Sequence, residues 1–352
     1  MPESPFWKII EMSHRATIMD VARLAGVSKV TVSYVLNGHS SSARISNPTK
    51  ERVLKAAKEL DYSPSAIARM MVTKRCQTIG VVFQYAQYFA TWSDFTNEVM
   101  LGICQASVAS GFDLMLHTRA LADPRSEADA LTDGRVDGVL VLRDKDDPTL
   151  SDLINRTFPC VLFFTRHDSD SVSWVDSDNY GGGRIAAEHL IKLGHRKIGM
   201  ICGSENSTSA IDRLQGFKDT LLEHNIPLPD SYLLSAPTFG DEPAAIEAYL
   251  SQADRPSAVF CFSDDVALHT IRTAQKIGLE IPRDLSIVGF DSLSRSEHSN
   301  PPLTSVRQPV REMAHLATEI LIKIANKEKV ENNKVMFPTE LDVRGSTAPP
   351  KD

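Results

Sequence analysis

The sequence lacks the features that would place the chain in a membrane or in an oxidising compartment. Its 352 residues hold no apolar run near the ~20 residues that a membrane-spanning helix requires. Residues 1–16 contain neither the apolar core nor the small-residue cleavage site of a secretory signal. The five cysteines are widely spaced and never form a C-x-x-C pair. These absences predict a cytoplasmic protein with reduced, mostly buried thiols.

The sequence also lacks the short motifs of several enzyme classes. It contains no H-E-x-x-H, no G-x-S-x-G and no P-loop, and no G-x-G-x-x-G follows a strand-like run. The glycines at 181–183 therefore predict a close helix-packing turn rather than a dinucleotide site. The pairs Asp176–Asp178 and Asp264–Asp265 are candidates for carboxylate catalysis, but Asp264 and Asp265 point to opposite faces if the chain there is extended. We expect no enzymatic activity and no metal or cofactor.

Positive charge is scarce in the chain as a whole and concentrated at its start. The formal net charge is −7, yet residues 1–75 hold twelve Lys and Arg against six Asp and Glu. That segment therefore carries +6 and the remainder −13. A small basic module on a large acidic body is typical of a DNA-binding head attached to a domain with another task. Chance clustering of charge on a solvated surface is the alternative.

Residues 17–62 predict three short helices that pack on one another. Thr17 and Ser28 are placed to cap the first two, Gly26 to end the first, and Pro48 to begin the third. Helices this short are unstable alone, so their apolar faces must meet. The expected helices cover residues 18–25, 29–37 and 48–60. The residues expected inside are Ile18, Val21, Ala22, Ala25, Val27, Val32, Val35, Leu36, Val53, Leu54, Ala57 and Leu60.

The spacing of Ala22, Gly26 and Val27 is typical of a helix-turn-helix. Ala22 allows close helix approach, Gly26 makes the tight turn and Val27 plugs the core, although a structural helical hairpin has the same pattern. Side chains near the start of the second helix are those that reach base edges in a major groove. Those expected to face away from the core are Lys29, Val30, Ser33 and Tyr34. The short polar side chains suited to phosphate oxygens are Ser28, Thr31, Ser33 and Asn37.

The segment after the third helix favours a hinge. Pro64 ends that helix, and residues 65–71 then offer one marginal turn of helix, which is unfolded in water when free. A flexible linker is one interpretation. The other is a hinge that folds only on DNA and inserts an apolar wedge into the minor groove.

From Thr78 onward, short apolar runs alternate with amphipathic stretches, a pattern typical of an α/β fold with a parallel sheet. The runs expected to be strands are 78–83, 113–118, 138–143, 160–165, 197–202, 258–262 and 285–290. The stretches expected to be helices are 96–111, 182–194, 213–225 and 264–278. Ligands of such folds bind at the carboxyl ends of strands, and the length suits two lobes with a cleft between them.

Polar side chains at the ends of these strands are the candidates for ligand binding. Arg213 lies just before or within the first turn of a helix, where its guanidinium can bind vicinal hydroxyls or a carboxylate. Asp291 ends one strand, and Ser263 with Asp264 end another. A structural Arg–Asp pair across the cleft is the alternative. Weaker candidates are Thr165 and Arg166. The aromatic residues of the loop 84–94 (Tyr85, Tyr88, Phe89 and Trp92) fit a stacking surface, a core or a dimer interface.

Three segments carry a resemblance to a known family. "TIMDVARLAGVSKVTVSYVLNG" at 17–38, "ERVLKAAKELDYSPSAIAR" at 51–69 and "TIGVV" at 78–82 resemble the lactose-repressor/galactose-repressor (LacI/GalR) family of bacterial transcription regulators, over roughly residues 17–346. The resemblance implies five segments. They are an extension at 1–16, a DNA-binding head at 17–62, a hinge at 63–76, an effector-binding and dimerisation body at 77–346, and a tail at 347–352. The body is expected to resemble a periplasmic sugar-binding protein, with lobes at 77–175 plus 308–337 and at 176–307 plus 338–346.

The resemblance also assigns roles to individual residues. It implies base reading by Lys29, Val30 and Tyr34, and a hinge that includes Ala68 and the wedge residue Met71. It places Arg213 and Asp291 at recurrent effector-contact positions and Phe239 at the position of a stacking aromatic. Two departures concern the operator sequence: Tyr34 stands where the family usually has arginine, and the loop 39–47 is about three residues longer than usual.

We therefore expect a homodimeric transcription regulator, most simply a repressor, that binds a pseudo-palindromic double-stranded operator under control of a small molecule. A sugar or sugar derivative fits Arg, Asp and an aromatic, while a purine or other metabolite fits the same fold. The sequence leaves open whether the effector releases or recruits DNA, and whether translation starts at Met1 or Met12. A sugar-binding transport component without a DNA role is the alternative, but it needs a secretory signal and no head.

Overall fold

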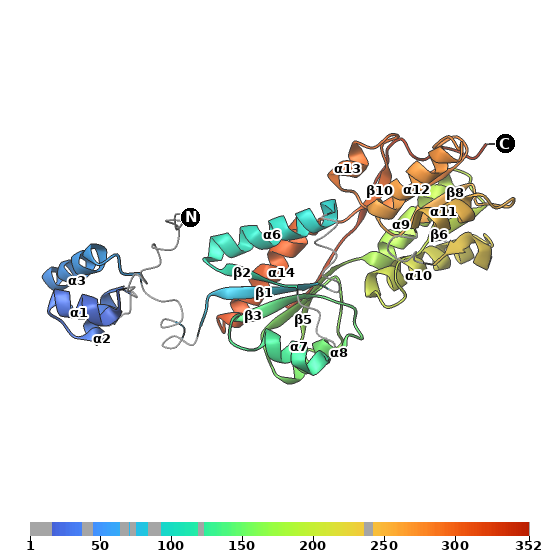
Figure 1. Cartoon of the computed structure of the whole chain (residues 1–352). Helices are drawn as coiled ribbons and strands as arrows, with labels where there is room; N and C mark the ends of the chain where they lie inside the picture. The colour runs from blue at the N-terminus through green and yellow to red at the C-terminus, as the bar shows by residue number, and fades with distance from the viewer. Residues whose placement is uncertain are drawn as a thin grey trace, which may run out of the picture. The chain divides into compact units, whose positions relative to one another are not determined.

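The computed structural model describes residues 16–36, 45–63, 70, 75–83, 93–118, 123–235 and 242–351, and the chain divides into two compact units (Figure 1). The first unit is Met1–Cys76 and the second is Gln77–Asp352. Several expectations fall outside the described residues: Asn37, Ala68, Met71, Phe239 and the aromatic loop at 84–92. Within the described ranges, no helix is long and apolar enough to cross a membrane.

The first unit contains the three expected helices, α1 (Ile18–Ala25), α2 (Lys29–Leu36) and α3 (Asn47–Glu59). Thr17 and Asp20 form a capping box: the backbone N–H of Asp20 donates to Thr17 Oγ1 at 3.4 Å, and that of Thr17 to Asp20 Oδ2 at 3.0 Å. Gly26 adopts a left-handed φ of 63°, which ends α1 as expected and starts the tight turn into α2.

The core of this unit differs from the expectation at one residue. Val21, Val32 and Val53 are fully buried at its centre. Leu54, expected inside, is 54% exposed, and Ala56 is buried instead. The 100° step per residue in a helix explains the difference, since Val53, Ala56 and Ala57 share one face of α3 and Leu54 lies to its side. The helix-turn-helix therefore closes over small side chains.

The second unit contains two six-stranded sheets, one in each lobe. The first sheet has the order β11-β5-β4-β3-β1-β2 and is parallel throughout. Its strands are β1 (Thr78–Phe83), β2 (Asp113–His117), β3 (Gly138–Leu142), β4 (Cys160–Phe163), β5 (Ser173–Ser177) and β11 (Lys334–Phe337).

The second sheet has the order β12-β10-β9-β8-β6-β7, and β12 is antiparallel to β10 while the other pairs are parallel. Its strands are β6 (Ile198–Ile201), β7 (Leu233–Leu234), β8 (Ala258–Cys261), β9 (Ser286–Asp291), β10 (Thr304–Arg307) and β12 (Glu340–Asp342). The chain crosses between the lobes after β5, after β10 and after β11, so neither lobe is one continuous segment.

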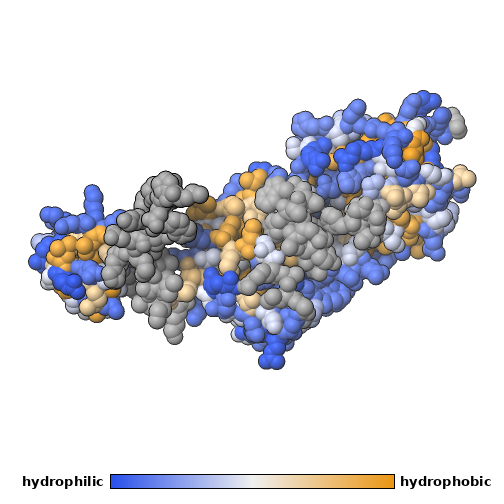
Figure 2. Space-filling view, viewed as in Figure 1, coloured by the Kyte–Doolittle hydropathy of each residue, from blue (hydrophilic) through white to orange (hydrophobic). Residues whose placement is uncertain are grey.

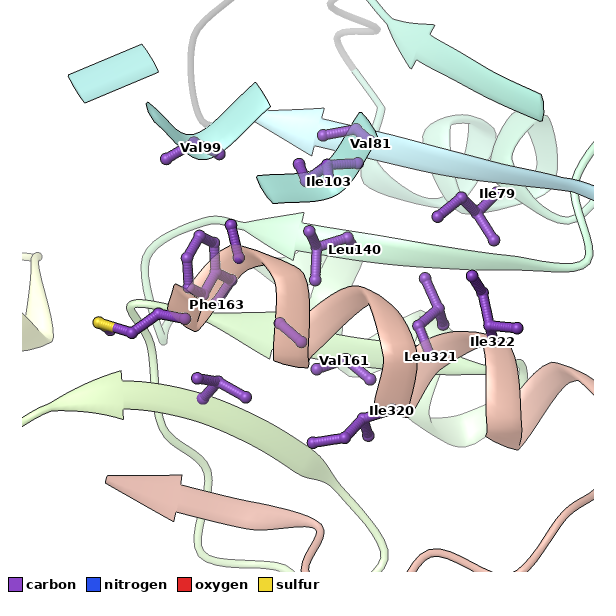
Figure 3. Close-up of a cluster of buried hydrophobic side chains, with 14 of the residues drawn as sticks. Ile79, Val81, Val99, Ile103, Leu140, Val161, Phe163, Ile320, Leu321 and Ile322 are labelled. Carbon is purple, nitrogen blue, oxygen red and sulfur yellow. The ribbon is translucent and has the colours of Figure 1, made fainter. Parts of the chain in front are cut away.

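Helices cover both faces of each sheet. On the first sheet α6 (Asp94–Ser110) and α14 (Val310–Ala325) share one buried cluster with the strands; Figure 3 shows Ile103 of α6 and Leu321 of α14 near Leu140 and Val161. The opposite face packs on α7 (Pro124–Leu131) and α8 (Pro148–Asn155). The second sheet lies between α9 (Asn179–Lys192) with α10 (Thr208–Glu223) and α11 (Glu242–Leu250) with α12 (Asp264–Lys276). Short helices are η3 (Asp230–Tyr232) and α13 (Ser294–Glu297).

All seven runs expected to be strands are strands, and six of them are almost entirely buried, whereas β2 lies at a sheet edge and is partly exposed. The sequence did not predict β5, β7, β10, β11 and β12. Of these, β7, β11 and β12 lie at sheet edges, and β5 and β10 contain polar residues that interrupt the apolar pattern. Two further expectations are wrong. The thiols are not mostly buried, since Cys104 is exposed and only Cys261 is fully buried, though all five are free. The glycines at 181–183 lie inside α9 rather than in a turn.

Glycine does set the distance between α9 and α10. A Cβ added at Gly183 would lie 2.2 Å from the carbonyl oxygen of Arg213, and one at Gly216 would lie 2.0 Å from that of Tyr180. Both obstacles are backbone atoms, which cannot move aside as a flexible side chain can. The two helices therefore approach backbone to backbone, and this contact holds Arg213 against the start of α9.

Replacing Gly216 with Ala is expected to destabilise the second unit by about 1–3 kcal/mol, because the methyl group forces α9 and α10 apart. Urea unfolding followed by circular dichroism measures the change. Leu222→Ala is the matched control on the same helix, since Leu222 is 75% exposed and its truncation is expected to be nearly neutral. Equal stability of the Gly216 variant and wild type would contradict the close approach.

Candidate ligand cleft and nucleic-acid interface

The exposed face of α2 carries the residues expected to read DNA. Val30 is 56% exposed, Tyr34 is 36% exposed, and Lys29 is also exposed, while Val32 on the opposite face is fully buried. The hydroxyl groups at the start of α2 serve its cap. Ser28 Oγ accepts from the Thr31 backbone N–H at 3.1 Å and lies 2.9 Å from Thr31 Oγ1. Ser33 is half-buried.

Arg213 is a fully enclosed guanidinium in the second lobe. The residue is 4% exposed and lies in the second turn of α10, because the helix begins at Thr208 rather than at Arg213 as expected. Its Nε donates to Asn179 Oδ1 at 2.8 Å, and one Nη donates to the carbonyl oxygen of Phe262 at 2.6 Å. The guanidinium also stacks on Phe290, with its Cζ 3.5 Å from the ring centroid. These contacts fix the direction of the remaining Nη.

Asp291 ends β9 in a strained conformation beside this guanidinium. Its φ is 118°, a region that a non-glycine residue rarely adopts. Asp291 Oδ1 accepts from Gln308 Nε2 at 2.7 Å, and Gln308 Oε1 accepts from Ser177 Oγ at 2.7 Å. Ser177 ends β5 in the first lobe, whereas Asp291 ends β9 in the second. Gln308, which follows β10, therefore connects the carboxyl ends of strands from the two sheets.

Burial sets the protonation of this cluster. It raises the pKa of Asp291 to about 8, and the positive charge of Arg213 limits the rise. It lowers the pKa of Arg213 to about 10, while the nearby carboxylates of Asp291, Asp176 and Asp264 oppose the fall. Arg213 therefore stays charged at neutral pH. Among the described residues no carboxylate lies within ion-pair distance of it, so the expected alternative of a direct Arg–Asp pair is not observed.

Ser263 and Asp264 begin a helix rather than end a strand, because β8 stops at Cys261. Ser263 caps α12 by accepting from the Val266 backbone N–H at 3.4 Å. Asp264 accepts from Ser296 Oγ and Ser305 Oγ, both at 2.5 Å, and from the Leu293 backbone N–H. Both of its oxygens are therefore used within the lobe, where they hold the segment after β9.

The two weaker candidates lie after β4 in the first lobe. Thr165 is buried, and its hydroxyl donates to the carbonyl oxygen of Arg143. Arg166 reaches across to the second lobe, where it donates to Asp212 of α10. The structure thus brings Arg213, Asp291 and Arg166 to the same junction between the lobes.

Sequence reasoning missed the groups that position Arg213 and Asp291. Asn179 lies directly after the acidic pair that was considered for catalysis only, so the signal was present but assigned to other chemistry. Gln308 follows a strand that the sequence did not predict. The aromatic ring under Arg213 comes from Phe290, whose place in a strand gave no hint that it faces a guanidinium. Within the described part of the chain, no three His, Cys, Asp or Glu side chains form a group that could hold a metal ion.

Two family models match the chain. Residues 17–65 match the bacterial regulatory proteins of the lacI family, and residues 187–347 match a periplasmic binding protein-like domain. The repressor PurR of Vibrio vulnificus (strain CMCP6) is 35% identical over 94% of this chain and 98% of its own length. The regulator CelR of Thermobifida fusca is 33% identical over 96% and 100%. The chain belongs to the lacI family of bacterial regulatory proteins.

Other relatives agree with this assignment. The ribose operon repressor of Haemophilus influenzae is 35% identical over 92% of this chain and 96% of its own length. The solved complex of the regulator CelR with cellobiose has a TM-score of 0.70 and 33% identity, covering 94% of this chain and all of that chain. The lac repressor dimer bound to operator has a TM-score of 0.80 at 24% identity, covering 95% and 99%, and shows the shared fold. This LacI-family chain is a DNA-binding transcription regulator and not an enzyme.

The stability of this regulator is expected to fall as pH rises from 6 to 8.5, and Asp291→Asn is expected to reduce the fall. The folded state keeps a proton on Asp291 up to its pKa of about 8, whereas an unfolded Asp has lost it above an ordinary value of about 4. The folded state therefore binds more protons over this interval, and raising the pH removes that advantage. The asparagine side chain does not ionise and keeps the acceptor for Gln308.

Urea unfolding at pH 6 and pH 8.5 measures the free energy of unfolding, and its fall between these pH values is expected to be smaller by about 2–3 kcal/mol in the variant. Glu205→Gln is the control, because Glu205 is an exposed carboxylate of the same lobe. A pH dependence identical to that of wild type would show that Asp291 is ionised throughout.

Proposed function

We propose that this LacI-family regulator is a cytoplasmic repressor whose homodimer binds a pseudo-palindromic operator, and whose operator affinity is set by a sugar or sugar derivative between the two lobes. One observation carries the proposal: a buried Arg213 and Asp291 lie at the carboxyl ends of the second sheet, and Gln308 connects them to the first. Ligands of α/β folds bind at such ends. The DNA-binding unit at 17–62 supplies the output.

The domain division follows the same proposal. Residues 63–76 form the hinge, the first lobe consists of 77–175 and 308–337, and the second of 176–307 and 338–346. The crossings after β10 and β11 support the later boundaries, and β5 extends the first lobe two residues further, to Ser177.

Arg213 and Asp291 are proposed to bind the effector through its hydroxyl groups. Arg213 donates from Nε to Asn179 and from one Nη to the carbonyl oxygen of Phe262, which leaves the other Nη to donate to the effector. One carboxyl oxygen of Asp291 accepts from Gln308. A donor beside a carboxyl group suits vicinal hydroxyls. The relatives named for cellobiose and for the ribose operon support a sugar. Thr165, Ser263 and Asp264 shape the walls through their internal hydrogen bonds.

Effector binding is proposed to change the angle between the lobes. A ligand that bonds Asp291 competes with Gln308, and Gln308 is also held by Ser177 of the first lobe. Loss of one bond therefore alters a contact between the lobes. A ligand shifts such an equilibrium only by its difference in affinity for the two arrangements, typically about 1–3 kcal/mol.

The homodimer is proposed to use the exposed face of α6. Leu101, Cys104 and Val108 follow one another at helical spacing, and Leu101 and Val108 are 45% and 80% exposed. Figure 2 shows apolar surface on the part of the body that includes α6. An apolar stripe on one helix meets its own copy across a two-fold axis, and two heads then match two half-sites.

Arg213→Lys is expected to abolish the response to effector while leaving operator binding intact. A lysine carries the charge but not the planar fork that bonds Asn179 and Phe262. Cellobiose, ribose and a panel of other sugars are first screened by thermal shift on wild type. The operator affinity of wild type and variant is then measured by mobility shift with and without the sugar that binds. An equal response in both proteins would remove Arg213 from the effector site.

Tyr34 is proposed to read the operator beside Lys29 and Val30, with Ser28, Thr31 and Ser33 at phosphates. A tyrosine offers one hydroxyl and a ring that can lie on a thymine methyl group, whereas the arginine usual at this position can bind guanine through two hydrogen bonds. Binding selection with wild type is expected to return half-sites without a strict guanine at that position. Tyr34→Ala is expected to weaken binding by about 1–3 kcal/mol and to relax the preference there. An invariant guanine that Tyr34→Ala leaves unchanged would contradict this role.

A further inference from the structure

Arg166 and Asp212 form an ion pair that joins the two lobes beside the cleft. Arg166 follows β4 of the first lobe and donates through Nη2 to Oδ2 of Asp212 in α10 of the second. The two side chains are 27% and 22% exposed, so water screens the pair only in part. Asp212 is adjacent in sequence to Arg213. An effector bound at Arg213 therefore lies next to this contact.

A second contact supports the pair. Ser209 Oγ, in the first turn of α10, donates to the carbonyl oxygen of Phe164 at 3.2 Å. Residues 164–166 and the first turns of α10 together form a seam between the lobes. Phe164 adopts a φ of 60°, which turns the chain after β4 toward α10. The seam is thus built from segments that each lobe holds in a fixed conformation.

The same guanidinium faces a second carboxylate, within its own lobe. Arg166 Nε lies 3.6 Å from Asp176 Oδ2, which is within ion-pair distance but too long for a hydrogen bond. Asp176 is fully buried, and its Oδ1 accepts from the Ser177 backbone N–H and from Asn179 Nδ2 at 2.8 and 2.9 Å. In the described part of the chain Asp176 Oδ2 accepts no hydrogen bond.

A buried carboxylate oxygen without a donor is costly, and an approaching guanidinium removes that cost. Arg166 thus pairs with Asp212 across the seam and also faces Asp176 of its own lobe, whose Oδ2 accepts no hydrogen bond from the described residues. In the observed arrangement Arg166 lies within ion-pair distance of both acids, so parting the lobes removes only the pair with Asp212. A closer pair with Asp176 then offsets part of that loss, which lowers the free energy that a ligand must supply to part the lobes.

We propose that Arg166 is a two-position latch: when it is bound to Asp212 it holds the lobes together at the seam, and when it turns to Asp176 it lets them part. This proposal rests on the proposed function, because it assigns the regulation of the same cleft. It makes Arg166 a positioning residue that acts between the lobes. The effector changes the balance by altering the position of α10 at Arg213.

The latch predicts opposite effects of removing its two acids. Asp212→Asn removes the ion pair across the seam, so Arg166 pairs with Asp176 and the lobes part. Asp176→Asn removes the carboxylate that competes with Asp212 for Arg166, so the lobes stay joined. The dissociation constant for the selected operator, measured by mobility shift on full-length protein without effector, is expected to change on the order of 5-fold in opposite directions. Glu223→Gln is the matched control. Glu223 lies on α10, as Asp212 does, but its ion-pair partner at 2.7 Å is Arg184 of α9, so this pair lies entirely within the second lobe. Changes in the same direction, or none beyond the control, would overturn the latch.

Hydrogen exchange of the seam gives a measurement that does not depend on DNA. Asp212→Asn is expected to increase the amide exchange of residues 164–166 and of the first turns of α10, and Asp176→Asn to decrease it. If Asp176→Asn fails to fold, Arg166→Gln takes its place and must increase amide exchange as much as Asp212→Asn does. The double variant Arg166→Gln/Asp212→Asn must then show no more exchange than either single variant. Unchanged exchange in Asp212→Asn refutes the latch. The two proposals can fail separately. If exchange changes as expected but the protein binds no DNA fragment specifically, the proposed function is refuted and the latch is supported.

Discussion

The arrangement of the cleft depends on the burial of the Arg213 guanidinium. Taking such a charge out of water costs several kcal/mol, and the surroundings must repay that cost with geometry. They do so through the amide of Asn179, the carbonyl of Phe262 and the face of Phe290, while acidic side chains such as Asp176 and Asp264 stand further off. Each of these groups comes from the carboxyl end of a strand or the start of a helix. The second lobe must therefore keep its strand order and helix spacing for the charge to be tolerated.

The close packing of α9 on α10 follows from the same constraint. Gly183 and Gly216 bring the backbones of the two helices into contact, which places Asn179 at the start of α9 within reach of Arg213 on α10. A wider spacing would leave the guanidinium without its partner. Gly183, one of the glycines at 181–183, thus serves a packing function that positions a binding residue.

The polar groups between the lobes form two connected systems. Gln308 links Asp291 in the second sheet to Ser177 in the first, and Arg166 links Asp212 to the region of Asp176. Both systems have one end at the cleft and cross from one lobe to the other. A small molecule at Arg213 and Asp291 is therefore in a position to influence both, which is the physical requirement for coupling ligand binding to a change in lobe angle.

The sequence by itself determined the three helices of the DNA-binding unit, seven of the strands and the family. These features depend on local periodicity, on caps such as Thr17 and Gly26, and on apolar runs that can only be buried. It also pointed to Arg213 and Asp291, of which Asp291 ends β9 as expected and Arg213 lies in the second turn of α10. Only the tertiary structure decided what surrounds them. Asn179 and Phe290 reach Arg213 because α9, α10 and β9 pack together within the second lobe. Gln308 reaches both Asp291 and Ser177 because the chain crosses between the lobes next to it, after β10. Pairings of this kind depend on strand order and helix spacing, which no local pattern encodes.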